Sequence, residues 1–142
     1  MRVALAEELG GIGSVKLGEL PDPVPAAGQA LVRVHGAGVG PWDVGFLAGG
    51  LPGIALPFVP GQEVAGVVEA AGEGAGVQPG ERVYAVLFPA GGGFAELTLA
   101  SADREKPDPL TSIRPRPRPL PRVTFPRTWH RTRGDRSPNT CG

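Results

Sequence analysis

Residues 56–87 read LPFVPGQEVAGVVEAAGEGAGVQPGERVYAVL, and this stretch predicts a strand, a turn and a second strand. Residues 62–71 are apolar and rich in valine, which favours a strand that is covered on both faces. The glycine cluster at 72–76 interrupts regular structure, because glycine adopts positive φ at little cost. Pro79 and Gly80 predict a tight turn, after which residues 82–87 form the second strand.

Further short strands are predicted on both sides of this stretch, at residues 2–6, 15–20, 30–35 and 94–100. Residues 21–25 hold three prolines and predict a loop, because proline has no N–H to donate to a sheet. Many short strands joined by glycine and proline turns predict a small, mainly β domain, either a barrel or a sandwich.

A single short helix is predicted to begin at Pro41, where the missing N–H of proline has no intrahelical partner to lose. The pairs Trp42/Phe46 and Val44/Ala48 lie one turn apart, so they are expected to form its buried face. Two glycines at 49 and 50 predict the end of the helix.

Composition limits the class of protein. The 142 residues suit one domain, and the lone Cys141 excludes an internal disulfide framework and any cysteine-built metal site. The chain has no apolar run of membrane-spanning length and no N-terminal basic region followed by an apolar core. A cytoplasmic protein without a membrane span is expected.

The net charge of zero hides two different segments. Residues 1–110 hold 6 Lys and Arg against 13 Asp and Glu, whereas residues 111–142 hold 8 Arg against one Asp. The second segment contains six prolines and no helix or strand period. It has too little apolar surface to offset an ordering cost of about 1–2 kcal/mol per residue. Residues 107–142 are therefore predicted to be a disordered tail, and we hypothesise that this tail is frameshifted or artificial.

Three blocks of sequence carry a family resemblance. They are Pro60-Gly61-x-Glu63-x-x-Gly66-x-Val68, then Pro79-Gly80-x-Arg82-Val83, then Gly91-Gly92-Gly93-Phe94-Ala95-Glu96. In this order and spacing they resemble the N-terminal domain of the medium-chain dehydrogenase/reductase superfamily, over residues 1–106. The resemblance implies a GroES-like, partly open β-barrel with one short helix.

The resemblance also bears on metal binding. The zinc branch of the superfamily has a cysteine and a histidine at the positions of Gly40 and Gln62. Glycine has no donor atom and a neutral amide is a poor zinc ligand. Asp43, Glu63 and His35 remain, but they do not form a convincing set of three ligands. No metal is expected.

The segment Gly38-Val39-Gly40-Pro41-Trp42-Asp43 resembles the Gly-Val-Asn-Pro-x-Asp element of the zinc-independent quinone oxidoreductases and enoyl reductases. That branch implies hydride transfer from NADPH to a conjugated carbonyl, a quinone or an enone, with hydrogen-bond donors stabilising the enolate. Gly40 replaces the family asparagine and Leu51 replaces a frequent tyrosine, so two polar groups are absent from the presumed pocket.

The resemblance gives Asp43, Gln62 and Glu63 as catalytic candidates, and Gly40 and Pro41 as cofactor-binding candidates. Alternatives stay open for each carboxylate: Asp43 also suits a helix N-terminus, and Glu63 better suits a structural hydrogen-bond acceptor. For Gln62 it stays open whether the side chain faces the substrate cleft.

The expected function is the substrate-side domain of an NADPH-dependent, zinc-independent oxidoreductase. One βαβ unit takes about 30 residues, and only 32 residues follow position 110. This chain is therefore expected to bind NADPH weakly or not at all and to be inactive, which leaves open whether it is an enzyme.

Two alternatives remain. The Arg/Pro-rich tail suits a non-catalytic binding module, although the acidic body would repel nucleic acid. The chain also suits a non-functional truncated product, whose unpaired strand edges would favour self-association into a homo-oligomer.

Overall fold

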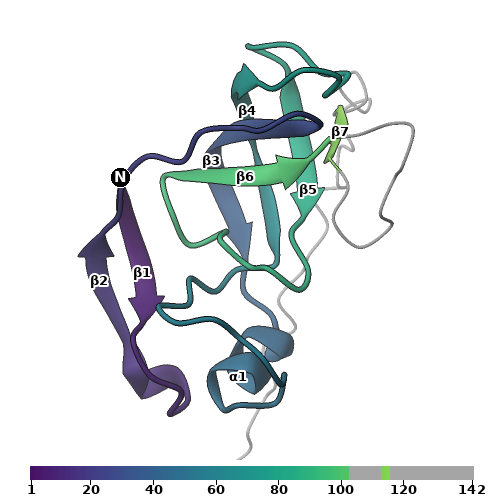
Figure 1. Ribbon diagram of the computed structural model, residues 1–142. Coiled ribbons are helices and arrows are strands. Elements are labelled where there is room, and N and C mark those ends of the chain that lie inside the picture. The colour runs from purple at the N-terminus through teal and green to yellow at the C-terminus, as the bar shows by residue number, and fades with distance from the viewer. Residues whose placement is uncertain (103–112, 116–142) are drawn as a thin grey trace, which may run out of the picture.

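The computed structural model describes residues 1–102 and 113–115, and it consists mainly of strands (Figure 1). The elements in chain order are β1 (Arg2–Ala6), the 3-10 helix η1 (Ile12–Ser14), β2 (Val15–Glu19), β3 (Gln29–Gly38), α1 (Pro41–Leu47), β4 (Glu63–Ala71), β5 (Arg82–Val86), β6 (Leu97–Ser101) and β7 (Ile113–Pro115). The short helix and most strand bounds agree with the prediction from sequence.

The strands form two antiparallel sheets. β1 pairs with β2, and a five-stranded sheet has the order β6-β3-β4-β5-β7. Over the described residues the strands do not close into a barrel, which agrees with the partly open arrangement that was expected. Figure 1 shows the β1–β2 hairpin beside the larger sheet and α1 at one end of it.

Strand β6 begins three residues later than predicted, because the preceding segment pairs with β1 instead. The N–H of Ala4 donates to the carbonyl of Phe94, and the N–H of Glu96 donates to the carbonyl of Arg2. An isolated bridge joins Val3 to Ala95. These contacts tie the hairpin to the rest of the domain.

The prediction that β4 is covered on both faces was wrong. Its burial alternates: Val64 and Val68 are buried, whereas Glu63, Ala65 and Glu69 are exposed. The sheet is antiparallel, so one face packs on the core while the other faces solvent. The buried face contributes to the main cluster of Ala30, Val32, Val64, Val68, Ala75, Val77, Val83, Ala85, Leu87, Ala100 and Ala102.

The predicted buried face of α1 was confirmed at Phe46 and wrong at the other three residues. Trp42 and Val44 are 44% and 45% exposed and Ala48 is exposed, whereas the helix buries Asp43 and Leu47 together with Phe46. The last two join Ala6 and Phe58 in a second small core cluster. Spacing of three and four residues is preserved, but a carboxylate occupies one position of the buried stripe.

Most of the predicted tail, 107–142, lies outside the described residues. The structure therefore does not test whether the tail is frameshifted or artificial, or whether it binds nucleic acid. Within that range the structure describes Ile113–Pro115, which pairs antiparallel with β5 at the sheet edge. No helix in the described part of the chain is long and apolar enough to cross a membrane.

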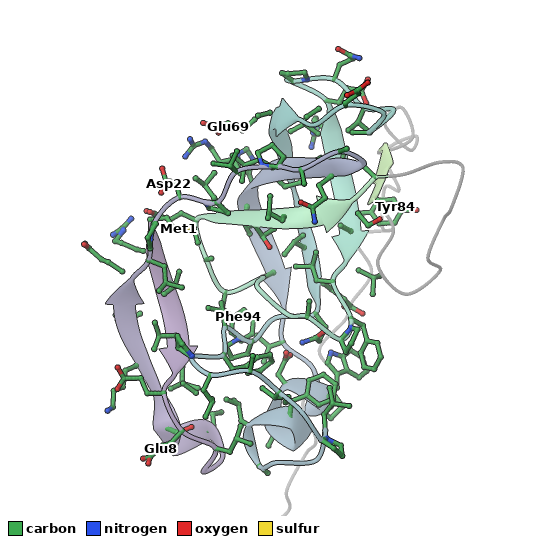
Figure 2. All side chains as sticks on the ribbon, in the orientation of Figure 1. Met1, Glu8, Asp22, Glu69, Tyr84 and Phe94 are labelled. Atoms are coloured by element: carbon green, nitrogen blue, oxygen red, sulfur yellow. The ribbon has the colours of Figure 1, made fainter. Side chains whose placement is uncertain are left out.

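Two terminal ion pairs predict a pH dependence of stability. The ammonium group of Met1 donates to the Leu20 carbonyl at 2.8 Å and lies 2.9 Å from the carboxylate of Asp22. Figure 2 labels Met1 and Asp22. The hydrogen bond to Asp22 raises the pKa of this ammonium above its ordinary 8.0. Hydrogen bonds from the Arg2 N–H and guanidinium lower the pKa of Glu96 below 4.5.

The raised pKa means that the Met1 contribution is present below pH 8 and is lost as pH rises through the folded value. The Glu96 contribution is present above its unfolded pKa and is lost as pH falls through the folded one. We expect the urea midpoint to decline modestly at both ends, because exposed pairs contribute little. Asp22→Asn should remove only the alkaline decline, and an unchanged alkaline limb would contradict the assignment.

Candidate functional site

At the start of α1, the backbone groups of Gly40 are hydrogen-bonded to Asp43 within the same turn. Gly40 is extended, with φ −121° and ψ 165°, and Pro41 begins the helix. The N–H of Gly40 donates to Oδ2 of Asp43 at 2.8 Å, and its carbonyl accepts the N–H of Asp43 at 3.1 Å. Proline has no N–H. The two residues predicted to contact a cofactor therefore offer it no free backbone N–H.

Asp43 joins this helix to a distant turn. Its side chain is 2% exposed, and its Oδ1 accepts the backbone N–H of Gly61 at 2.9 Å. Both carboxylate oxygens are therefore occupied by backbone N–H groups from two segments. This geometry favours the structural interpretation of Asp43, in which the carboxylate caps the helix and fixes the Pro60–Gly61 turn.

The Pro60–Gly61 turn is held on its other side by residues that follow β5. The carbonyl of Gly61 accepts the N–H of Gly93 at 2.9 Å, and the carbonyl of Pro60 accepts that of Phe94 at 2.9 Å. Gly61 has φ 94°, and a Cβ there would lie 2.7 Å from the Phe94 nitrogen. Both facts require glycine at this position.

Gln62 is the unusual residue of the site. Its side chain is 2% exposed, yet neither Nε2 nor Oε1 has a hydrogen-bond partner among the described residues. Its backbone carbonyl accepts the N–H of Leu87 at 2.7 Å. Buried amides are nearly always paired, since an unpaired one costs about 1–3 kcal/mol. Gln62 therefore carries an unused donor and an unused acceptor.

Glu63 lies apart from this junction. It is the first residue of β4, it is exposed, and it stands opposite Gly38 and Val86. Consecutive residues of an extended chain point to opposite faces, so Glu63 is directed to the outer face of the sheet while Gln62 is buried. The structure thus brings Asp43 and Gln62 to one junction and leaves Glu63 on the other side.

Trp42 belongs to the site although sequence reasoning gave it only a packing role. A Cβ built on Gly40 would lie 2.3 Å from Cε2 of the Trp42 indole and 2.5 Å from its Nε1. The indole therefore occupies the space beside Gly40 into which a longer side chain would project. An asparagine at position 40 would not fit while Trp42 keeps this position.

A hollow of about 550 Å³ opens beside the junction. Its lining residues have no polar side chains and come from two loops: Leu51, Pro52, Gly53, Ile54, Ala55, Pro57, Phe58, Val59, Pro89, Ala90 and Gly92. The loops meet where the N–H of Gly92 donates to the carbonyl of Val59 at 2.8 Å. The volume suits a small organic ligand. Sequence reasoning placed only Leu51 here, because the contact between the two loops is not local.

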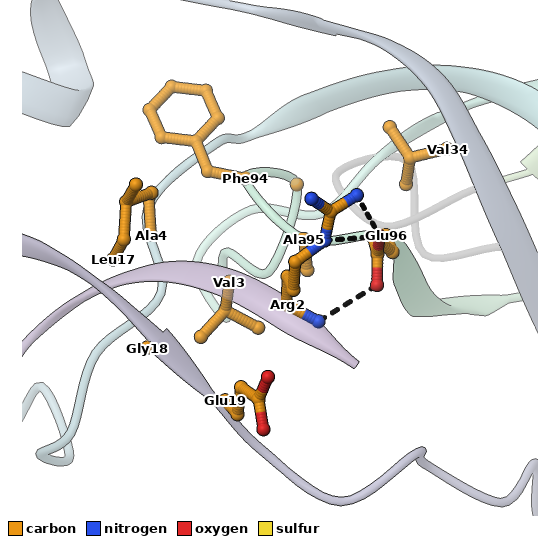
Figure 3. Close-up of a pocket in the computed structure, with 11 residues that line it drawn as sticks. Arg2, Val3, Ala4, Leu17, Gly18, Glu19, Val34, Phe94, Ala95 and Glu96 are labelled. Carbon is orange, nitrogen blue, oxygen red and sulfur yellow. Dashed lines mark hydrogen bonds and ion pairs between the residues drawn. The ribbon is translucent and has the colours of Figure 1, made fainter.

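A second hollow, of about 610 Å³, lies by the hairpin and is lined by Arg2, Glu19, Phe94 and Glu96 among others (Figure 3). Its most polar groups satisfy one another: the Arg2 guanidinium and backbone N–H both bind the carboxylate of Glu96. Gly93 and Phe94 line this hollow and also bind the Pro60–Gly61 turn. We favour the smaller apolar hollow as the candidate site, because Arg2 and Glu96 are already engaged with each other here.

Metal-binding residues do not gather in the described part of the chain. No group of three or more His, Cys, Asp or Glu side chains comes together within residues 1–102 and 113–115. At the two positions of interest the chain has Gly40 and the buried amide of Gln62.

Comparison with known proteins gives one family match. The alcohol dehydrogenase GroES-like domain matches residues 26–107. Among curated proteins, mouse quinone oxidoreductase is 36% identical over 114 residues, which are 78% of this chain and 34% of that protein. Human quinone oxidoreductase is 36% identical over 104 residues, covering 71% of this chain and 31% of that one.

Solved structures agree with this match. A mycobacterial protein determined in complex with NADPH superposes with a TM-score of 0.65 and 36% identity, over 81% of this chain and 32% of that one. A probable oxidoreductase from Mycobacterium abscessus gives a TM-score of 0.65 and 34% identity, over 72% and 32%. The chain spans about one third of the length of each of these proteins.

Proposed function

Since this chain belongs to the alcohol dehydrogenase GroES-like domain family, we propose that residues 1–106 form the substrate-side domain of an NADPH-dependent oxidoreductase that reduces a quinone or an enone without a metal. The quinone oxidoreductases among its relatives and the NADPH complex among similar structures support this proposal. The chain matches only about a third of those proteins, so the activity of a whole enzyme is part of the proposal.

The observation that carries the proposal is the apolar hollow of about 550 Å³ between the two loops. Leu51, Phe58 and Pro89 give it hydrocarbon walls, which suit a flat conjugated carbonyl compound better than a charged substrate. Val59, which lines the hollow, directly precedes the Pro60–Gly61 turn. Gln62 follows this turn, and its side-chain amide has no partner among the described residues.

NADPH, when bound, supplies the hydride for such a reaction. The remaining requirement is a hydrogen-bond donor toward the carbonyl oxygen, where negative charge develops. We propose Nε2 of Gln62 for this role, because it has no partner in the described residues. Gln62 is buried and does not itself line the hollow, so its side chain would have to turn toward the substrate to donate. Asp43 acts as a positioning residue, because it holds the N–H of Gly61 immediately before Gln62. A catalytic role for Glu63 stays a prediction.

Contact with the cofactor is proposed at Gly40 and Pro41. Both backbone groups of Gly40 are engaged with Asp43, so contact of NADPH with Gly40 and Pro41 stays a prediction. The described strands pair only antiparallel and include no βαβ unit. We therefore expect the 142-residue chain to bind NADPH weakly and not to turn over. Micromolar NADPH affinity in a calorimetric titration would contradict this.

Quinone binding tests the substrate side. We expect 1,4-naphthoquinone to shift the amide NMR peaks of residues 51–59 and 89–92 in the full chain carrying Cys141→Ser, which removes the reactive thiol. Leu51→Asp should abolish these shifts, because it places a charge in the apolar wall. The matched control Leu17→Asp lies on an exposed position and should leave them unchanged. Shifts confined to the hollow of Figure 3 would contradict the proposal.

Gln62→Met is expected to stabilise the domain. The two side chains have similar length, and methionine removes the desolvation cost of the unpaired amide, about 1–3 kcal/mol. The urea midpoint should rise, while Gln78→Met at an exposed position should change stability by about 0.5 kcal/mol or less. A clear loss of stability in Gln62→Met would show that the amide is paired in solution, which would remove its assignment as the free donor.

A further inference from the structure

A third hollow lies on the outer face of the five-stranded sheet, away from the loops discussed above. Its volume is about 390 Å³ and it spans three neighbouring strands. β3 contributes His35 and Gly36, β4 contributes Ala65 and Gly66, and β5 contributes Arg82, Val83 and Tyr84. The lining thus combines a guanidinium, an imidazole and a phenol, and none of its described residues has a carboxylate.

The strand register explains why this place is concave. Ala65 stands opposite Tyr84, and Val67 stands opposite Arg82. Arg82 and Tyr84 are two residues apart and therefore project on the same face of β5. On the other side of Ala65, the register of β3 is irregular between Val34 and Gly36. His35 lies at this irregularity, is exposed, and lines the hollow. The small Ala65 forms the floor between taller side chains.

The charge distribution singles out Arg82. Residues 1–102 contain only four Lys or Arg side chains against ten Asp or Glu, and three of the four cations form ion pairs: Arg2 with Glu96, Lys16 with Glu7, and Arg33 with Glu69. Arg82 is the fourth, and within the described part of the chain no carboxylate lies within 4.0 Å of it.

Two carboxylates, Glu63 and Glu69, lie on the same face of the sheet, but neither forms an ion pair with Arg82. Glu69 binds Arg33 through two hydrogen bonds of 2.6 Å. Glu63 borders the adjoining hollow, which shares Tyr84, and does not line this one. Among the described residues, the guanidinium of Arg82 therefore keeps its donors available, although carboxylates outnumber cations over residues 1–102.

We propose that this hollow binds the carboxylate of a small aromatic acid. The planar fork of Arg82 matches a carboxylate in a bidentate arrangement. His35 lies across the hollow and provides a further ring nitrogen, and the ring of Tyr84, which is 44% exposed, packs against the aromatic ring of the ligand. The volume is within the range of small-molecule sites.

Benzoate is the probe for this site. In an NMR titration of the full chain at low salt, benzoate should shift the amide peaks of residues 35, 65, 82 and 84 in a saturable manner. Benzamide has the same ring without the charge and should shift them far less. Inorganic phosphate should also bind more weakly, because it has no ring to pack on Tyr84. Equal shifts with benzamide, or stronger binding of phosphate, would overturn the proposal.

Substitutions provide the second arm. Arg82→Gln should weaken benzoate binding about tenfold or more, the loss expected for a charge-assisted hydrogen bond. Arg33→Gln is the matched control, because Arg33 flanks Val67 on the other side of the same face but is held by Glu69. It should change the affinity by about twofold or less. Wild-type affinity in Arg82→Gln would refute the site.

This site and the proposed quinone site are separate, so their tests are independent. Arg82→Gln should leave the naphthoquinone shifts at residues 51–59 unchanged, which also shows that the variant is folded. Leu51→Asp should likewise leave benzoate binding unchanged.

Discussion

Gly66→Ala is expected to destabilise the domain by about 3 kcal/mol, the upper end of the usual cost of overpacking a core. A Cβ at Gly66 would lie 2.1 Å from the carbonyl oxygen of Arg33 and 2.9 Å from Cγ1 of Val32. Both atoms belong to the adjacent strand β3, and the first is backbone, so rotation of a side chain cannot relieve the contact. The strands would have to separate, which would weaken the β3–β4 ladder at the centre of the sheet.

Gly36→Ala is the control for this substitution. Gly36 lies on β3 opposite Ala65, one register position from the Val34–Gly66 pair, and a Cβ there would meet nothing within 4 Å. Its effect on the free energy of unfolding should be about 0.5 kcal/mol or less. Urea denaturation of both variants measures the difference. Equal midpoints would mean that β3 and β4 are not held as closely as the structure shows.

Asp43→Ala is expected to cost about 3 kcal/mol or more. The substitution leaves the buried N–H of Gly61 and the N–H of Gly40 without acceptors, and each buried unpaired donor costs about 1–3 kcal/mol. The damage would extend beyond the helix, because the same carboxylate fixes the turn that precedes β4. Asp43→Asn should have a smaller effect, since its amide oxygen can still accept one of the two N–H groups.

Glu73→Gln, at an exposed carboxylate, is the matched control and should leave the urea midpoint nearly unchanged. The double substitution Asp43→Ala, Gln62→Met tests whether Asp43 positions Gln62. If Asp43 positions Gln62, the stabilisation by methionine should differ between the two backgrounds. An Asp43→Ala variant with wild-type stability would return this carboxylate to the catalytic role that its family position suggests.

Much of the fold could be predicted from local patterns. The strands at 2–6, 15–20 and 82–87 were found close to their predicted bounds, and α1 begins at Pro41 as expected. Proline lacks an N–H, and glycine adopts positive φ, as it does at Gly74, Gly76 and Gly80. These constraints act within a few residues, so local sequence indicates where most elements begin and end. β6 is an exception, because its start depends on the pairing of the preceding residues with β1.

The site was predicted less well. The motif positions of Asp43 and Gln62 indicated that both matter, but not that the first is occupied by two backbone donors while the second is buried without a partner. Periodicity assigned the buried face of α1 to Trp42 and Val44, which the structure exposes. The indole of Trp42 instead lies against Gly40.

The sequence by itself determined most of the strands, the turns, the single α-helix and the family to which the chain belongs. The tertiary structure alone decided which face of β4 and of α1 is buried, where the two loops enclose an apolar hollow, and which cations of residues 1–102 form ion pairs with described carboxylates. The physical reason is that turns depend on the backbone freedom of a few neighbouring residues, whereas burial and charge pairing depend on segments that are distant in the chain, as Asp43 and Gly61 or Arg33 and Glu69 are.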